Sequence, residues 1–334
     1  MLFRSLDLVP FDATDPAALE TAWRVSPRDT RATLGVGTDG EPFVVDLAAD
    51  GPHVLVAGTT GAGKSELLQT LVAGLAVGNR PDEMSFVLID YKGGAAFRDC
   101  AELPHTVGMV TDLDGHLTER ALRSLGAELR RREALLAGSG CTDLDEYIAL
   151  ASPTREPLPR LVLVVDEFAT LAEELPDFVG GLVGIAQRGR SLGVHLVLAT
   201  QRPGGVVSAD IRANTSLRIA LRVTDASEST DVVDVRDAAD IAPDLPGRAV
   251  LRVGAGAVHS LQAARVGGQA TGSSPVSVRP APWERVGDAP TVVDAPMTAG
   301  PTDLARLVRA CRAAAGALGS PRSTAPGCHR CRTW

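Results

Sequence analysis

Short apolar runs recur along the middle of the chain, and most of them are followed by a longer stretch with helical periodicity. Several runs are apolar at every position rather than at alternate positions, which is typical of parallel strands covered on both faces. A later pair of runs flanks Gly254-Ala255-Gly256 and predicts a hairpin. The predicted strands are His53–Ala57, Phe86–Ile89, Val107–Val110, Leu161–Val165, His195–Ala199, Leu217–Val223, Ala249–Val253 and Val258–Ala264.

Helices are predicted between and around these strands. They are Pro16–Arg24, Ser65–Val77, Asp114–Leu136, Phe178–Arg190 and Thr302–Leu318. Because strand and helix alternate, the pattern predicts an α/β fold with a doubly wound, mostly parallel sheet and helices on both faces.

Composition divides the chain into four segments. Residues 1–30 are a mixed N-terminal lead-in segment, and residues 31–266 carry the strand–helix alternation of the α/β domain. Residues 267–300 are rich in Gly, Pro and Ser and predict a linker. Residues 301–334 hold the last predicted helix and a tail of different composition.

Charge and cysteine usage narrow the class of protein. The net charge of −8 argues against a protein that coats nucleic acid, although a local basic stripe is compatible with it. No apolar run approaches the roughly 20 residues of a membrane span, and the N-terminus lacks a signal-peptide pattern. Five scattered cysteines fit a reducing compartment, and Cys328 and Cys331 lack the second ligand pair of a zinc site. We therefore expect a cytoplasmic protein.

The chain contains only two lysines, Lys64 and Lys92, beside 31 arginines. Both lysines follow apolar runs and lie in glycine-rich segments. Since arginine fills the general basic role, these positions indicate a need for a compact ammonium group, as in a phosphate-binding loop. The alternative is that codon bias removed lysines and left two by chance.

Residues 58–65 match the phosphate-binding pattern G-x-x-x-x-G-K-S in full, between a predicted strand and a predicted helix. The backbone N–H groups and the helix N-terminus would face the phosphates of ATP. Lys64 would reach the β- and γ-phosphates, and Ser65 would bind Mg²⁺. The predicted nucleotide-binding residues are Gly58, Thr59, Thr60, Gly61, Ala62, Gly63, Lys64, Ser65 and Glu66. The alternative is a glycine turn without function.

Two acidic residues, Asp166 and Glu167, end the apolar run that begins at Leu161. A buried strand that ends in two carboxylates is costly unless a cation or a water network receives them. We expect Asp166 to hold the Mg²⁺ shell and Glu167 to act as general base on the attacking water. The alternative is a strand that simply exits to solvent.

Polar residues also follow two neighbouring strands. Gln201, after the strand that ends near Ala199, is expected to contact the γ-phosphate or the attacking water; the alternative is a turn begun by Arg202-Pro203. Asp90 and Lys92 follow another strand and would lie at the edge of the same site. The alternative for this pair is a cap on a glycine turn.

Together these stretches resemble the FtsK/SpoIIIE-type motor ATPases, and within them the EccC-like type VII secretion ATPases of actinobacteria. Further stretches that carry the resemblance are FVLIDYKGGAAF (86–97), VVDEF (164–168), AQRGRSLGVHLVLATQRP (186–203), ANTSLRI (213–219) and LPGRA (245–249), all within residues 22–266. The resemblance implies a RecA-like P-loop NTPase fold, assembly into a homo- or hetero-oligomeric ring for which a hexamer is one expectation, and ATP-driven translocation of a polymer.

Motors of this type often complete their site with an arginine from the adjacent subunit, which stabilises charge in the transition state. The candidates are Arg120, Arg123, Arg188, Arg190 and Arg218. Arg123 is preferred because it lies on the helix before the Arg130–Arg132 run. For any one of them, the alternative is a surface charge.

Compared with family members, this chain is expected to hold one ATPase module, no membrane helix and no winged-helix domain. Residues 326–334, read two bases later through G/C-rich codons, can encode Trp-Leu-Pro-Pro-Leu-Pro-Asp-Leu, which resembles the segment that joins the first two EccC-like modules. We therefore expect a frameshifted tail, in which the Cys-x-x-Cys is accidental.

Three functions stay open. The first is a type VII secretion-like motor that moves protein, with protein substrates or other ATPase modules favoured as partners over DNA. It would be cytoplasmic, with recruitment to the inner face of the membrane by partners. The second is a double-stranded DNA translocase of the FtsK kind. The third is a regulatory module that binds ATP with little turnover.

Overall fold

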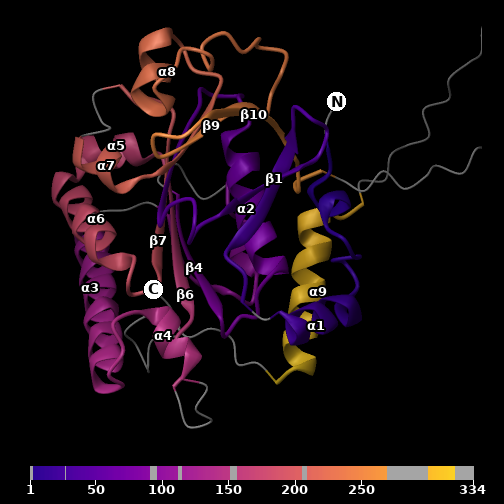
Figure 1. Cartoon of the computed structure of the whole chain (residues 1–334), viewed down its shortest axis with the longest axis vertical. Helices are drawn as coiled ribbons and strands as arrows, with labels where there is room; N and C mark the ends of the chain where they lie inside the picture. Colours follow the sequence, from indigo (N-terminus) through magenta and orange to yellow (C-terminus); the bar gives the residue numbers. More distant parts are fainter. Residues whose placement is uncertain are drawn as a thin grey trace, which may run out of the picture.

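The computed structural model describes residues 3–26, 28–90, 96–111, 115–150, 156–204, 209–268 and 300–319. Within these residues the strands form one sheet, in the order β2-β1-β10-β9-β8-β3-β7-β6-β4-β5. Helices cover both faces of the sheet (Figure 1). The predicted α/β class, with a large and mostly parallel sheet between helices, is confirmed.

The parallel part of the sheet forms its middle and one edge. It contains β3 (His53–Ala57), β4 (Met84–Asp90), β5 (Thr106–Thr111), β6 (Arg160–Asp166), β7 (Val194–Thr200) and β8 (Leu217–Leu221). Every residue of β3, β4, β7 and β8 is buried. The apolar runs of β3, β4 and β7 predicted this, whereas β8 also buries Arg218. Because these strands run in one direction, their carboxyl ends meet at one edge, where Ala57 pairs with Thr200 and Asp90 with Asp166.

The other edge is antiparallel. It contains β1 (Arg31–Gly37), β2 (Pro42–Asp46) and the predicted hairpin of β9 (Arg248–Val253) and β10 (Val258–Ala263). The sequence pattern did not predict β1 and β2. A Cβ at Gly35 would clash with the carbonyl oxygen of Gln262, so β1 needs glycine where it passes β10. Glycine weakens a local strand pattern, and pairing across the chain determines this strand instead.

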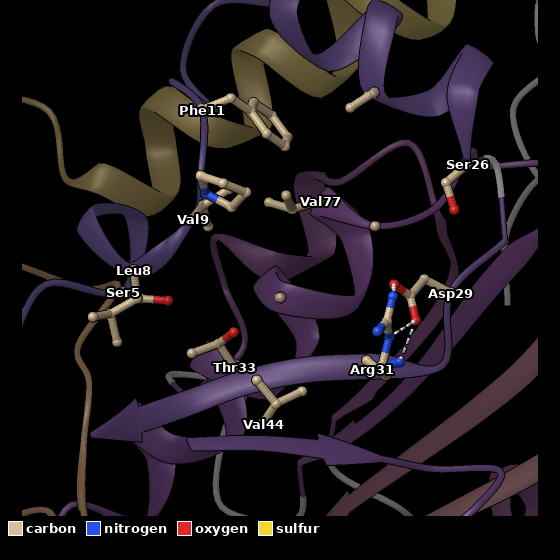
Figure 2. Close-up of a pocket in the computed structure, with 14 residues that line it drawn as sticks. Ser5, Leu8, Val9, Phe11, Ser26, Asp29, Arg31, Thr33, Val44 and Val77 are labelled. Atoms are coloured by element: carbon tan, nitrogen blue, oxygen red, sulfur yellow. Dashed lines mark hydrogen bonds and ion pairs between the residues drawn. The ribbon is translucent and has the colours of Figure 1, made fainter. Parts of the chain in front are cut away.

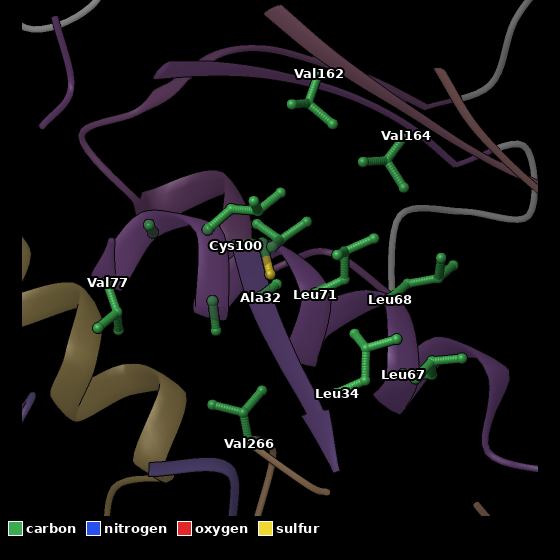
Figure 3. Close-up of a cluster of buried hydrophobic side chains, with 14 of the residues drawn as sticks. Ala32, Leu34, Leu67, Leu68, Leu71, Val77, Cys100, Val162, Val164 and Val266 are labelled. Carbon is green, nitrogen blue, oxygen red and sulfur yellow. The ribbon is translucent and has the colours of Figure 1, made fainter. Parts of the chain in front are cut away.

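One face of the sheet is covered by α1 (Pro16–Val25), α2 (Lys64–Val77), η2 (Cys100–Glu102) and α9 (Asp303–Ala317). Figure 3 shows Leu67, Leu68 and Leu71 of α2 in one cluster with Leu34 of β1 and Val164 of β6. The cluster is apolar throughout and fully buried, so α2 is held rigidly along its length. Its N-terminus, which carries the glycine-rich loop, is therefore fixed against the sheet.

The opposite face is covered by α3 (Gly115–Gly138), α4 (Leu144–Ala149), α5 (Phe168–Glu174), α6 (Pro176–Gly189), α7 (Ala209–Asn214) and α8 (Ala226–Val233) (Figure 1). Arg132 of α3 is buried and donates to Glu128 at 2.9 Å and to the backbone oxygens of Pro159 and Leu192 at 2.7 and 2.8 Å. This side chain ties α3 to the starts of β6 and β7.

The N-terminal segment packs on the first face together with α9. Trp23 of α1 is fully buried and donates its indole N–H to the Val77 oxygen at 2.9 Å. Next to it, Val9, Phe11, Val44 and Val77 line a largely apolar pocket of about 330 Å³ (Figure 2). The described part of residues 1–30 and α9 thus share a core with the sheet. The division into four segments stays a prediction.

Two predicted segments fall outside the described residues: most of the linker, at 269–299, and the tail from 320 onward. Lys92 of the Asp90–Lys92 pair is also outside them. Among the helices that the structure does describe, none is long and apolar enough to cross a membrane.

Candidate nucleotide-binding site

The glycine-rich loop joins the carboxyl end of β3 to α2. Gly61 and Gly63 adopt φ angles of 77° and 102°, which side-chain-bearing residues rarely adopt. A Cβ at Gly63 would also lie 2.9 Å from the Gly247 nitrogen. Gly63 precedes the first residue of α2, and no side chain caps the helix there. The uncapped N-terminus therefore leaves room for an anion at the positive end of the helix dipole.

Backbone hydrogen bonds hold this loop from both neighbouring strands. The Gly58 N–H donates to the Thr200 oxygen at 3.1 Å, and the Thr59 N–H donates to the Arg222 oxygen at 2.9 Å. On the other side the Gly247 N–H donates to the Ala62 oxygen at 2.8 Å. The loop is thus preorganised before any ligand is bound.

Lys64 contacts both predicted carboxylates. Its Nζ donates to Asp166 Oδ1 and, at 2.7 Å, to Glu167 Oε1. The three residues are 5%, 4% and 4% exposed, so this is a buried cluster of one cation and two anions. Burial raises the pKa of the Asp166 carboxyl, and this outweighs the opposite effect of Lys64. The structure thus joins the two motifs that the sequence placed 102 residues apart.

Glu167 has an unusual backbone, with φ of 57° and ψ of 41°. A non-glycine residue in this left-handed region costs roughly 1 kcal/mol or more, and such residues concentrate at functional sites. Its N–H donates to Asp166 Oδ1 at 2.9 Å, and the fully buried Phe168 follows as the first residue of α5. The turn therefore directs the Glu167 carboxylate toward Lys64 instead of along the strand axis.

Gln201 lies beside the loop, directly after β7. Its Oε1 accepts a hydrogen bond from the Thr60 hydroxyl at 2.7 Å. A residue at this place can respond to a ligand in the loop, and its role as sensor stays a prediction. Asp90 is buried at the end of β4 and accepts from the Ala96 N–H at 3.2 Å.

A cavity of about 390 Å³ opens over the loop. Its lining includes Thr59–Gly61, Gly63–Glu66 and Gln201 from the predicted site. It also includes Pro246-Gly247 and Ala263–Arg265, for which sequence reasoning assigned no role. Leu245–Ala249 contributes only to the family resemblance, and no sequence pattern points to Arg265.

The residues present fit a magnesium nucleotide. The loop offers backbone N–H groups, Lys64 offers an ammonium, and the cavity continues past Ser65 and Glu66. The Ser65 hydroxyl and the Asp166 carboxylate are the oxygen ligands available to Mg²⁺, which prefers few protein ligands beside phosphate and water. Among the described residues no cluster of three His, Cys, Asp or Glu could hold a metal by itself.

The arginine candidates lie in different surroundings. Arg218 is buried, with Nη1 2.9 Å from Asp234 and Nη2 donating to the Gly254 oxygen at 2.8 Å. Arg188 lies 3.6 Å from Glu133. The side chains of Arg120 and Arg123 on α3, and of Arg190 after α6, are exposed. Arg218 is engaged within its own chain. The role of the preferred Arg123, which is exposed on α3, stays a prediction.

Known proteins share this fold and these motifs. The sequence profile of the FtsK/SpoIIIE family matches residues 16–205. The type VII secretion system protein EssC of Staphylococcus aureus is 41% identical over 262 residues, which are 77% of this chain and 18% of EssC. The chain therefore spans less than a fifth of that relative.

Two solved structures are similar over most of the chain. The cytoplasmic domain of the type VII secretion ATPase EccC of Thermomonospora curvata has a TM-score of 0.74 at 36% identity, covering 80% of this chain and 32% of that one. ATPases 2 and 3 of the same EccC, in complex with a signal sequence peptide, have a TM-score of 0.67 at 26% identity, covering 86% and 47%. The family match spans more than half of the chain and includes the P-loop, Asp166, Glu167 and Gln201. This chain belongs to the FtsK/SpoIIIE family of P-loop ATPases.

Proposed function

We propose that this chain is an ATP-binding and ATP-hydrolysing motor module that drives protein translocation in a type VII secretion-like system. The observation that carries the proposal is the contact of Lys64 with Asp166 and Glu167 under the glycine-rich loop. Lys64 would bind the β- and γ-phosphates, Ser65 and Asp166 would hold Mg²⁺, and Glu167 would accept the proton of the attacking water. Bound Mg²⁺ supplies charge neutralisation at the phosphates.

The pairing of Lys64 with two carboxylates implies that an exchange of its partners is the first step in ligand binding. Its ammonium is occupied by two carboxylates, so it must leave at least one of them to reach a phosphate. The triphosphate then replaces a carboxylate as its partner, and Glu167 becomes available as a base. This exchange also supports the regulatory alternative. A module that favours the state in which Lys64 is paired with both carboxylates would hydrolyse ATP slowly on its own.

Protein is favoured as the translocated polymer. The support is the similarity to EssC, and to an EccC structure that contains a signal sequence peptide. The net charge of −8 is also unfavourable for binding along a DNA backbone. We further propose assembly into a ring, completed by an arginine such as Arg123 from a neighbouring module, and recruitment to the inner face of the membrane by partners.

Steady-state ATP hydrolysis, with and without long double-stranded DNA at low salt, tests the choice of polymer. Low salt is needed because contacts to phosphates weaken steeply as salt rises. We expect a rate of ATP hydrolysis that DNA does not change, or that stays low until partner modules are added. A several-fold stimulation by DNA that is lost in Lys64→Ala would make the chain a DNA translocase instead.

Replacing Gln201 with alanine is expected to lower kcat about tenfold, with little change in nucleotide affinity, because the residue would act on the γ-phosphate or the attacking water. Single-turnover hydrolysis and nucleotide titration measure the two quantities. Thr60→Val is the matched control, since it breaks the Thr60–Gln201 hydrogen bond and keeps the amide. An equal loss in both variants would show that Gln201 only shapes the loop.

A further inference from the structure

The wall segment is defined as residues 263–268, which run from the end of β10 to the residues that bond to the start of α9. Ala263, Ala264 and Arg265 of this segment line the cavity. The Ala263 N–H donates to the Gly247 oxygen at 2.7 Å, and the Thr70 hydroxyl of α2 donates to the Ala264 oxygen at 2.9 Å. The wall segment is thus attached on its inner side to the helix that begins at the P-loop.

The N-terminal segment holds the wall from outside. The Arg265 N–H donates to the Phe3 oxygen at 2.8 Å, and the Arg265 oxygen accepts from the Ser5 N–H at 2.9 Å. Arg4 and Arg265 form a parallel bridge between these two bonds. Arg4 is therefore fixed beside the residue whose side chain faces the cavity.

The first turn of α9 holds the other end of the wall segment. The Leu304 N–H donates to the Val266 oxygen at 3.0 Å, and the Asp303 N–H donates to the Gly268 oxygen at 2.9 Å. Because these hydrogen bonds come from the start of α9, a displacement of its first turn would also displace the wall segment.

One ion pair joins the two anchors. Arg4 donates from Nε and Nη2 to the two carboxylate oxygens of Asp303, at 2.9 and 2.8 Å. Asp303 is 0% exposed, and Arg306 forms a second, longer ion pair with it at 3.5 Å. A bidentate pair of this kind fixes geometry as well as charge, and a buried carboxylate depends on its partner.

We propose that Arg4 and Asp303 are positioning residues for the nucleotide, because their ion pair fixes the wall segment and thereby the Arg265 side chain at the cavity. The inference rests on the proposed nucleotide binding. Arg265 Nε lies 3.3 Å from Glu66 Oε1, and the side chain is 47% exposed, so its outer N–H groups can donate to a nucleotide phosphate or sugar. Gly267 also packs on Glu66, since a Cβ there would lie 2.9 Å from both carboxylate oxygens.

Loss of the Arg4 charge removes the bidentate partner of the buried Asp303 carboxylate and leaves it only the longer ion pair with Arg306. The first turn of α9 then has to move so that water can reach the carboxylate, and the wall segment moves with it. The ion pairs of Lys64 with Asp166 and Glu167 join α2 to the end of β6 and do not involve the wall segment, so we expect the chemical step to be spared. The expected effect therefore falls on nucleotide affinity, with kcat unchanged.

Titration of the full chain with a fluorescent ADP analogue, together with kcat, tests this. Arg4→Gln is expected to raise the Kd about tenfold at constant kcat, since preorganisation of the cavity is lost. The double variant Arg4→Gln, Asp303→Asn is expected to recover part of the affinity, because it no longer holds a buried carboxylate that has lost its bidentate partner. Hydrogen exchange at residues 263–268 is expected to be faster in Arg4→Gln.

Arg312→Gln is the matched control. Arg312 anchors the other half of α9 by donating to the Glu102 oxygen at 2.8 Å and by pairing with the Glu102 carboxylate, away from the wall segment. We expect it to leave the Kd unchanged. Wild-type affinity in Arg4→Gln, or an equal loss in Arg312→Gln, would overturn the positioning role while nucleotide binding stands. If the unmodified chain and Lys64→Ala both fail to bind the analogue, the proposed function itself is wrong, and the positioning role with it.

Discussion

Lys64→Ala is expected to abolish ATP binding and turnover and also to destabilise the folded chain. In the proposed function the ammonium binds the β- and γ-phosphates, so we expect nucleotide binding to be lost. In the ligand-free chain Lys64 also pairs with Asp166 and Glu167, both 4% exposed. Removing one partner of a buried ion pair costs about 3 kcal/mol or more, because the remaining charge is uncompensated. Nucleotide titration and urea denaturation measure the two effects.

The two effects can be separated by removing the carboxylates as well. In the triple variant Lys64→Ala, Asp166→Asn, Glu167→Gln we expect most of the stability to return, because no buried charge is left without a partner. Nucleotide binding is not expected to return. A Lys64→Ala chain that bound ATP with unchanged affinity would contradict the phosphate-binding role of the loop.

Glu167→Gln is expected to lower kcat by about 100- to 1000-fold while nucleotide affinity is retained. The amide keeps the size of the side chain and the left-handed turn at this residue, but it cannot accept the proton of the attacking water. Lys64 keeps Asp166 as a partner, so the phosphate-binding half of the site stays intact. Single-turnover hydrolysis and nucleotide titration distinguish the two properties.

Glu173→Gln is the control for this change, because Glu173 is an exposed glutamate on the same short helix, α5, that follows Glu167. We expect it to hydrolyse ATP like the unmodified chain. Unchanged turnover in Glu167→Gln would mean that Glu167 is not the base, or that turnover is not the task of this site. The regulatory alternative would then become the better description.

Much of the candidate site was predictable because its parts are local motifs. A complete P-loop pattern between an apolar strand and an apolar helix fixes the loop, and adjacent acids at a strand end indicate the second half. Neighbouring parallel strands end at one edge, which brings Gln201 beside Thr60. The far wall of the cavity was not predictable, because Arg265 acquires its place only through contacts with Glu66, Phe3 and Ser5.

The strands and helices also divide into those that a local sequence pattern predicts and those that it does not. Strands buried on both faces need unbroken apolar runs, so β3, β4, β6 and β7 were visible as patterns along the chain. Edge strands β1 and β2 carry glycine and polar positions and exist through their pairing with each other and with β10. Short helices such as α7 and α8 contain too few turns to give a periodic signal.

The sequence by itself thus determined the α/β class, the glycine-rich loop between β3 and α2 and the two acids at the end of β6, because each depends on residues close together in the chain. The tertiary structure alone decided the pairing of Lys64 with both carboxylates, the cavity wall at Ala263–Arg265 and the Arg4–Asp303 ion pair. The physical reason is that these contacts join residues 102 to 299 positions apart, and no local pattern encodes which buried charges will meet.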